Sequence, residues 1–305
     1  MNHSKTILPS LLFLALPHAF GQGGPTLVGA GNGLSPGIAI APWQVTTFWL
    51  AGMSVIASVP VHAALPLPTT LANVSVTIKQ VLRAYSATFA VPILSIDQTN
   101  GCDENYPGTG PDCLITGITV VIPADLGTDP YYFQMDTVVV VSQSGVDSKS
   151  FGVNAVPDMI HVLTNCGAGF SVCVTHADGT LLADGPPATA GEVVVIYATG
   201  LGAMNGIFAN FDFHPNAGPS RPVDAKPVSL GGSAVQPLYV GQTFGQIGLY
   251  QINLKLPDSF PSAPACGGTV FNPLLSNLTI TIASSPVGLS SGSFDGAPIC
   301  IQPPQ

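Results

Sequence analysis

The residues best suited to chemistry in this sequence are three histidines, His161, His176 and His214. Each can act as a general base in hydrolysis if an acid orients its ring and a serine lies within reach. The most suggestive run is His176-Ala177-Asp178-Gly179, in which Asp178 could orient the imidazole. The same run is a common turn, in which an Asp side chain bonds the backbone nearby. We favour the turn, so a hydrolase is the least favoured function and no catalytic residue is assigned.

Two glycine-rich runs resemble functional motifs but lack what those motifs need. The run Gly33-Leu34-Ser35-Pro36-Gly37 matches G-x-S-x-G, in which the backbone N–H after the serine stabilises an oxyanion. That position is Pro36, which has no N–H. Gly200-Leu201-Gly202 has neither the G-x-G-x-x-G spacing nor a G-K-[ST] sequence of a phosphate loop. Both runs are interpreted as turns.

Four acidic residues surround the first pair of cysteines: Asp97, Asp103, Glu104 and Asp112. Their carboxylates are of the type that binds Ca²⁺, but their spacing does not fit an EF-hand loop. We favour a solvated acidic loop that a disulfide ties at its base. The sequence therefore predicts no metal site and no cofactor.

Exposed aromatic side chains can stack on sugar rings, and this gives the main alternative function, a carbohydrate-binding module. Trp43, Tyr131 and Tyr132 are the possible ligand-facing aromatics, and the last two follow a predicted turn at Asp129-Pro130. Trp49 and Tyr250 lie inside strand patterns, so they are expected in the core. The discriminating observation is exposure, since a buried ring offers no face to a sugar.

The six cysteines predict disulfides, because an even number in an exported chain is typical of a disulfide framework. Sequence alone does not choose among the 15 possible pairings. A zinc site is disfavoured, since Cys102 and Cys113 have ten intervening residues and Cys166 and Cys173 have six, unlike C-x₂-C. Local pairing is the simplest arrangement: Cys102 with Cys113, Cys166 with Cys173, and Cys266 with Cys300.

The N-terminus is typical of a signal peptide. Lys5 precedes the apolar run Ile7–Phe20, which is shorter than the roughly 20 residues that span a bilayer. Ala19-Phe20-Gly21 places small residues at the −3 and −1 positions of a cleavage site. We predict that residues 1–21 are removed and that no transmembrane segment follows. The mature chain is expected to be exported, to the periplasm, the cell surface or the medium.

The charge balance excludes polyanionic partners. The chain has 7 Lys and Arg, 16 Asp and Glu, and a net charge of −9. Removing Lys5 leaves 6 basic against 16 acidic residues, a net charge of −10. With so few cations the chain has no surface to neutralise phosphates, so neither nucleic acid nor an anionic membrane is expected as a partner.

Composition and periodicity predict an all-β fold. Hydrophobic residues make up 46% of the chain, together with 34 Gly and 29 Pro, which is typical of short strands joined by Gly/Pro turns. Val74, Val76 and Ile78 alternate with polar residues, the period of a half-buried strand. Ala90–Ile96 is predicted as one further strand. No segment keeps a 3.6-residue apolar period, so little helix is expected.

The sequence also predicts an internal duplication, because five strand-like words recur in the same order at a spacing of roughly 140–150 residues. We therefore expect a first β domain over residues 22–158, a connecting segment with short strands over 159–186, and a second β domain over 187–305. The matched words are TFWLAGM with IYATGLG, LANVSVTI with PVSLGGSAV, PILSIDQ with PLYVGQ, ITGITVVIP with LYQINLKLP, and TVVVVSQSGVDSKSF with LTITIASSPVGLSSGSF.

Several of these words, in their longer form, resemble the text of a known family. IAPWQVTTFWLAGM, PLPTTLANVSVTI, HADGTLL, PATAGEVVVIYATGLG and GLYQINLKLP are similar to the uncharacterised Solibacter-type C-terminal domain family of acidobacterial exported proteins. That family is similar to IPT/TIG immunoglobulin-like domains. The resemblance covers about Gly33 to Pro298 and implies two tandem immunoglobulin-like β-sandwiches of bacterial origin, with no established catalytic residue. The Cys102–Cys113 insertion and the long Asp258–Asn277 loop depart from the family pattern, so individual behaviour is expected there.

Together these observations favour an exported, non-enzymatic structural or interaction module of the adhesion type. The partner is an unknown protein or glycan, held by loops or by strand addition at a sheet edge.

Overall fold

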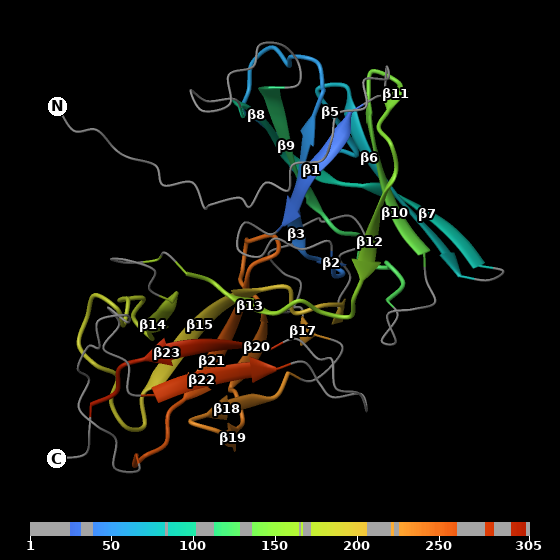
Figure 1. Cartoon of the computed structure of the whole chain (residues 1–305). Coiled ribbons are helices and arrows are strands. Elements are labelled where there is room, and N and C mark those ends of the chain that lie inside the picture. The colour runs from blue at the N-terminus through green and yellow to red at the C-terminus, as the bar shows by residue number, and fades with distance from the viewer. Residues whose placement is uncertain are drawn as a thin grey trace, which may run out of the picture.

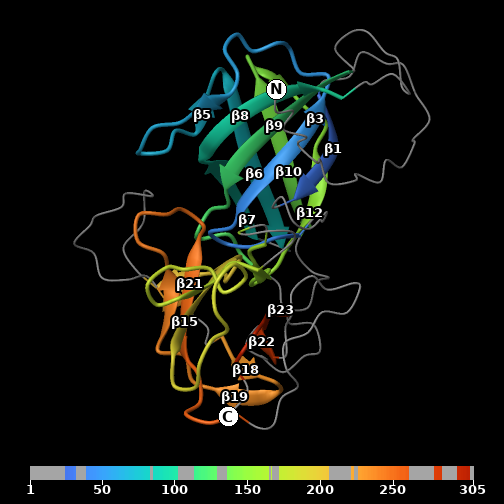
Figure 2. The same cartoon turned by 90° about the vertical axis from the view of Figure 1, so that its left-hand side faces the viewer.

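The computed structural model describes residues 25–31, 39–82, 85–101, 113–128, 136–164, 166, 172–205, 221–222, 226–260, 278–283 and 294–302. Every element named among these residues is a β-strand, so the all-β prediction is confirmed. The strands form two bodies in chain order, one above the other in Figure 1 and again in the turned view of Figure 2.

The first body is a sandwich of two sheets. One sheet has the order β1-β3-β9-β8-β4, and the other has the order β2-β12-β10-β6-β5, with β7 also paired to β6 and β11 to β10. The strands are β1 (Thr26–Gly31), β2 (Ala39–Ile40), β3 (Val45–Ala51), β4 (Val61–His62), β5 (Thr70–Leu71), β6 (Val74–Leu82), β7 (Tyr85–Val91), β8 (Ile93–Asn100), β9 (Leu114–Val121), β10 (Asp136–Gln143), β11 (Val146–Asp147) and β12 (Phe151–Ala155).

The second body has two principal sheets and one short ribbon. The orders are β13-β15-β21-β20, with β14 also paired to β15, then β19-β18-β22-β23, and the ribbon β16-β17. The strands are β13 (His161–Val162), β14 (Val174–His176), β15 (Val193–Thr199), β16 (Met204–Asn205), β17 (Arg221–Pro222), β18 (Val228–Leu230), β19 (Ser233–Val235), β20 (Tyr239–Gln242), β21 (Tyr250–Lys255), β22 (Leu278–Ala283) and β23 (Phe294–Ile299).

The two bodies share one topology, and it is that of the immunoglobulin fold. In chain order β1, β3, β8 and β9 correspond to the A, B, D and E strands, and β6, β7, β10 and β12 to C, C′, F and G. The second body repeats this with β13, β15, β20 and β21 in one sheet and β18, β19, β22 and β23 in the other. Ala39–Ile40 also pairs parallel to the last strand of the first copy, and in the second copy Ala188 makes a parallel bridge to Ile301, two residues beyond β23. The chain is therefore a tandem pair of immunoglobulin-like sandwiches.

Each sandwich has its own hydrophobic core. The first cluster is drawn from residues between Ile40 and Ala155, and the second from residues between Ile160 and Ile301. The strands β3 and β15 have the same length and the same alternating pattern of burial. Val74, Val76 and Ile78 are at most 1% exposed, which confirms the alternation predicted for β6.

Two segments differ from the sequence interpretation. Ala90–Ile96 is not one strand, because β7 ends at Val91 and β8 begins at Ile93 in the other sheet. Pro92 lies where the chain passes from one sheet to the other. Proline has no backbone N–H, so it cannot donate a hydrogen bond to a neighbouring strand there. The segment 159–186, expected between the domains, supplies β13 and β14 to the sheet of β15. Five of its side chains join the second core: Ile160, Val162, Val172, Val174 and Leu182.

The glycines of the TGLG run are required by close packing at the junction of the two sandwiches. Gly200 and Gly202 have φ angles of +71° and +84°. A Cβ on Gly200 would lie 1.9 Å from the Met159 carbonyl oxygen, and one on Gly202 would lie 2.3 Å from the Pro157 carbonyl oxygen. The segment entering the second sandwich therefore lies directly on this turn, which only glycine permits.

The disulfide predictions are confirmed in part. Cys166 is bonded to Cys173, as predicted, with the two Cα atoms 5.1 Å apart. Cys113 and Cys300 are disulfide-bonded as well. Their predicted partners, Cys102 and Cys266, lie outside the described residues, so those two pairings stay predictions. No helix in the described part of the chain is long and apolar enough to cross a membrane.

Candidate functional site

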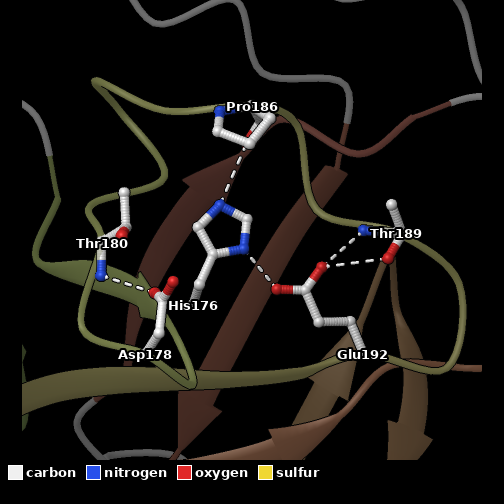
Figure 3. Close-up of polar contacts among 6 residues, drawn as sticks. All are labelled: His176, Asp178, Thr180, Pro186, Thr189 and Glu192. Atoms are coloured by element: carbon white, nitrogen blue, oxygen red, sulfur yellow. Dashed lines mark hydrogen bonds and ion pairs between the residues drawn. The ribbon is translucent and has the colours of Figure 1, made fainter.

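The most developed polar site lies at the edge of the second sandwich, where the turn after β14 meets the start of β15. A cavity of about 370 Å³ is lined by His176, Ala177, Asp178, Thr180, Pro186 and Glu192. His176 is the last residue of β14 and pairs with Val194 of β15, so the sheet register brings its ring towards Glu192. Figure 3 shows the imidazole between Glu192 on one side and Pro186 on the other.

Both ring nitrogens of His176 have hydrogen-bond partners. Nδ1 contacts the Glu192 carboxylate, and Nε2 lies 3.1 Å from the Pro186 carbonyl oxygen. A carboxylate and a carbonyl only accept hydrogen bonds, so the protonated imidazolium, with two N–H donors, satisfies both partners. Both ring nitrogens are therefore engaged by groups of the same connection between β14 and β15.

Glu192 is fixed by the turn that precedes it. Its Oε2 accepts hydrogen bonds from the Thr189 backbone N–H at 2.8 Å and from the Thr189 hydroxyl at 3.1 Å. Burial acts to raise the pKa of Glu192, but the hydrogen bonds from Thr189 and His176 outweigh it and hold the pKa below its usual value. The carboxylate is therefore kept ionised as the partner of His176.

Asp178 behaves as the turn interpretation predicts. Its Oδ1 accepts a hydrogen bond from the Thr180 backbone N–H at 2.9 Å, and the hydrogen bonds from Thr180 lower the pKa of this exposed carboxyl. Glu192 orients the ring in its place, 16 residues further along the chain. The pattern Thr189-x-x-Glu192 resembles a capping box, in which a Glu side chain accepts from the backbone N–H three residues earlier, and it was the signal available in the sequence.

A second histidine–carboxylate pair lies apart from this cavity. His161 Nδ1 is 2.9 Å from Asp295 Oδ2. Asp295 also accepts from the N–H groups of Val162 and Gly296, each at 2.8 Å. Burial acts to raise the pKa of Asp295, but the bonds from His161 and the two N–H groups lower it overall. The pair joins β13 to β23, so it binds the first strand of the sandwich to the last.

The described residues do not assemble a hydrolytic triad around His161 or His176. Neither His161 nor His176 has a serine among its described side-chain hydrogen-bond partners. His214 and the run Gly33–Gly37 lie outside the described residues. Within the described residues, no group of three or more His, Cys, Asp or Glu side chains is placed to hold a metal ion.

The aromatic residues proposed for sugar stacking are not brought together in the described part of the chain. The Trp43 side chain is only 7% exposed, so the expectation that it faces a ligand is wrong. It is buried because its backbone N–H bonds the Ile122 carbonyl, which holds the turn before β3 against the sheet. Tyr131 and Tyr132 lie outside the described residues. Tyr250 is 2% exposed, as expected for a core residue, and burial raises the pKa of its hydroxyl.

The acidic loop is described only at its first residue. Asp97 is exposed, and its Oδ1 accepts a hydrogen bond from the Gln98 backbone N–H at 2.8 Å. Asp103, Glu104 and Asp112 lie outside the described residues, so a Ca²⁺ site in this loop is neither supported nor opposed.

Comparisons with known proteins add little. No family model matches the sequence, and no curated protein matches it. Two solved structures cover 93% of the chain. One is a chimeric titin Z1Z2 functionalised with a KLER exogenous peptide from decorin (9% identity, 99% of that chain, TM-score 0.19), and the other is titin domains Z1Z2 in complex with telethonin (8% identity, 98% of that chain, TM-score 0.17). At such TM-scores the likeness carries no argument, and the Solibacter-type resemblance stays a prediction.

Proposed function

We propose that the chain is a non-enzymatic interaction module of an exported bacterial protein, and that it binds a protein partner at the free edge of β7. The observation that supports this most is the character of that edge. β7 pairs with β6 on one side, and no strand in the described part of the chain pairs with its other side. Figure 1 shows β7 at the right-hand margin of the first sandwich.

Among the described residues, nothing gives the edge of β7 the usual protection against strand addition. Half of the backbone N–H and C=O groups of an edge strand point outwards. Soluble proteins prevent these groups from pairing with another chain by charged side chains, proline or a covering segment. The sequence YSATFAV contains no charge and no proline. Ser86, Thr88 and Ala90 are exposed, with small side chains that leave the backbone accessible. An extended peptide can therefore add to this sheet through main-chain hydrogen bonds.

The polar site of the second sandwich supports the non-enzymatic part of the proposal. Its histidine has both nitrogens engaged, and its carboxylates accept bonds from turn N–H groups. These contacts fix the long connection between β14 and β15. The disulfides and the predicted signal peptide are what an exported scaffold requires.

The test uses the mature chain and two edge variants, Thr88→Lys and Ala90→Lys, which place a charge beside the free edge. Thr279→Lys is the matched control, because Thr279 is exposed on β22, a strand paired on both sides. The immobilised chain is presented to the secreted proteins of its own cells and to a glycan array. We expect a protein partner whose binding falls at least about tenfold in the edge variants, roughly 1.4 kcal/mol, and is unchanged in T279K. Binding to glycans alone, or equal binding by all variants, refutes the proposal.

A further inference from the structure

Lys226 and Asp158 form a buried ion pair at the entry to the second sandwich. Lys226 Nζ lies 2.6 Å from Asp158 Oδ2, and the two side chains are 2% and 3% exposed. Lys226 lies two residues before β18 and Asp158 three residues before β13. Lys255 and Asp258 form a contrasting pair on the surface of the same sandwich, 3.0 Å apart and 50% and 83% exposed.

A buried amine and a buried carboxylate in contact have an alternative to remaining charged. Taking both ions out of water carries a large desolvation penalty, which their attraction only partly offsets. Joining them as an amide removes both charges and leaves a neutral group. We propose that Lys226 and Asp158 condense to an intramolecular isopeptide bond in the folded protein.

The reaction is balanced within the pair itself. A bond forms between Lys226 Nζ and Asp158 Cγ, and one Cγ–O bond of the carboxylate breaks. Of the three hydrogens on the ammonium group, one stays on the amide nitrogen and two leave with the carboxylate oxygen as water. The positive and negative charges cancel, so no oxidant, reductant or co-reactant is required. The ammonium transfers a proton to the carboxylate before the neutral amine attacks.

The fold holds the two groups in place for this step. Met159 donates its backbone N–H to the Gly200 carbonyl at 2.8 Å, and a Cβ on Gly202 would lie 3.2 Å from the Asp158 Cβ. The Asp158 backbone is thus pinned on the Gly200–Gly202 turn while Lys226 approaches from the start of β18. Positioned reactants at contact distance react as if at very high concentration, and burial keeps water from reversing the step. The bond would join positions 68 residues apart.

The test is mass spectrometry of the full-length exported protein after reduction and alkylation of its cysteines. We expect a mass lower than that of the linear chain by one water, about 18 Da, and a branched chymotryptic peptide that joins Lys226 to Asp158. Lys255 and Asp258 serve as the internal control and should appear only in linear peptides. Asp158→Ala and Lys226→Ala should each restore the full mass. Asp158→Asn should still cross-link, with loss of ammonia, about 17 Da, to give the same amide.

Peptide mapping decides the outcome, because cyclisation of Asp178-Gly179 or Asp295-Gly296 also removes one water. Water loss with only linear peptides around Lys226 and Asp158 overturns the proposal. An intact mass equal to that of the linear chain, together with a Lys226 amine that reacts in the unfolded chain, also overturns the proposal. Lys226 and Asp158 are then an ordinary buried ion pair. These outcomes are independent of partner binding at β7, so neither proposal depends on the other.

Discussion

Substituting Gly200 by alanine tests whether the TGLG turn needs glycine because the backbone of residues 157–159 packs directly against it. Gly245 is a matched control, since it has the same φ angle of +71° and nothing lies within 4 Å of an added Cβ. At Gly200 the added Cβ would lie 1.9 Å from the Met159 carbonyl oxygen and 2.6 Å from its carbon. The two substitutions therefore share the backbone penalty and differ only in the steric one.

The magnitudes follow from these two terms and from the hydrogen bond that the clash weakens. A left-handed backbone costs an alanine about 1–2 kcal/mol, which is all that Gly245→Ala should lose. Gly200→Ala adds a backbone clash that cannot be relieved by rotating a side chain, and overpacking of this kind costs about 1–3 kcal/mol more. Moving Met159 away also weakens its N–H bond to the Gly200 carbonyl, worth about 1 kcal/mol. We expect a total loss of about 3–6 kcal/mol for Gly200→Ala.

Urea denaturation followed by far-ultraviolet circular dichroism measures the difference, with each transition fitted separately if the two sandwiches unfold apart. Equal destabilisation by Gly200→Ala and Gly245→Ala would refute the argument, because the close approach at Met159 would then carry no energy. A larger effect of Gly245→Ala would refute it too.

Two further substitutions probe contacts that hold the second sandwich together. Glu192→Gln should destabilise the protein at neutral pH and progressively less as the pH is lowered. The pKa of Glu192 in the folded protein lies below its usual 4.5, so the ionised carboxylate stabilises the fold above pH 4.5. That stabilisation is lost as the pH falls through the pKa of the folded state. Denaturation midpoints between pH 3 and pH 7 measure this pH dependence. Asp258→Asn is the control, because it replaces an exposed carboxylate and should change stability little. An effect of Glu192→Gln that does not depend on pH would contradict the prediction. Replacing both Cys166 and Cys173 by serine should lower the free energy of unfolding by about 2.5 kcal/mol, the loop-closure value for a disulfide with a separation of 7 residues. Calorimetry of the double variant checks this, and a change under about 0.5 kcal/mol would show that the loop is held by its other contacts.

The sequence predicted the fold well because the fold depends on short-range patterns. Alternation at Val74, Val76 and Ile78 needs only neighbouring residues to be recognised, and the repeated words carried the order of strands in both copies. Which strands pair with one another was harder to predict from the sequence. The equivalence of β18 and β19 with β6 and β7 depends on which sheet each strand joins, and Pro92 marks a change of sheet that a run of apolar letters conceals.

The partners of the polar side chains were predicted poorly, because they depend on which strands become neighbours in the fold. The sequence offered Asp178 as a possible partner of His176 but favoured a turn role for it, which the structure confirms, and it did not identify Glu192 as the partner. The observed partners lie far along the chain: Glu192 for His176, Asp295 for His161 and Lys226 for Asp158. Each pair is set by which strands the topology makes neighbours, and no local pattern records that. The Thr189-x-x-Glu192 spacing is a local pattern that could have indicated how Glu192 is held by its own turn, but not that it contacts His176.

The two copies fix their loops by different chemistry, and this bears on where function has diverged. Among the described residues of the first sandwich, loops are held by neutral amides: Gln80 exchanges hydrogen bonds with Gly127, and Gln98 with Ser54 and Ile56. The described ion pairs all lie between Asp158 and Asp295, in the second copy. Neutral amides hold a loop without a dependence on pH, whereas Glu192 and Asp295 are carboxylates whose pKa is lowered by their hydrogen bonds, so the contacts that they make in the second copy depend on pH. Within the described residues, the duplicated scaffold therefore presents an uncharged strand edge at β7 in the first copy and ion-paired connections in the second.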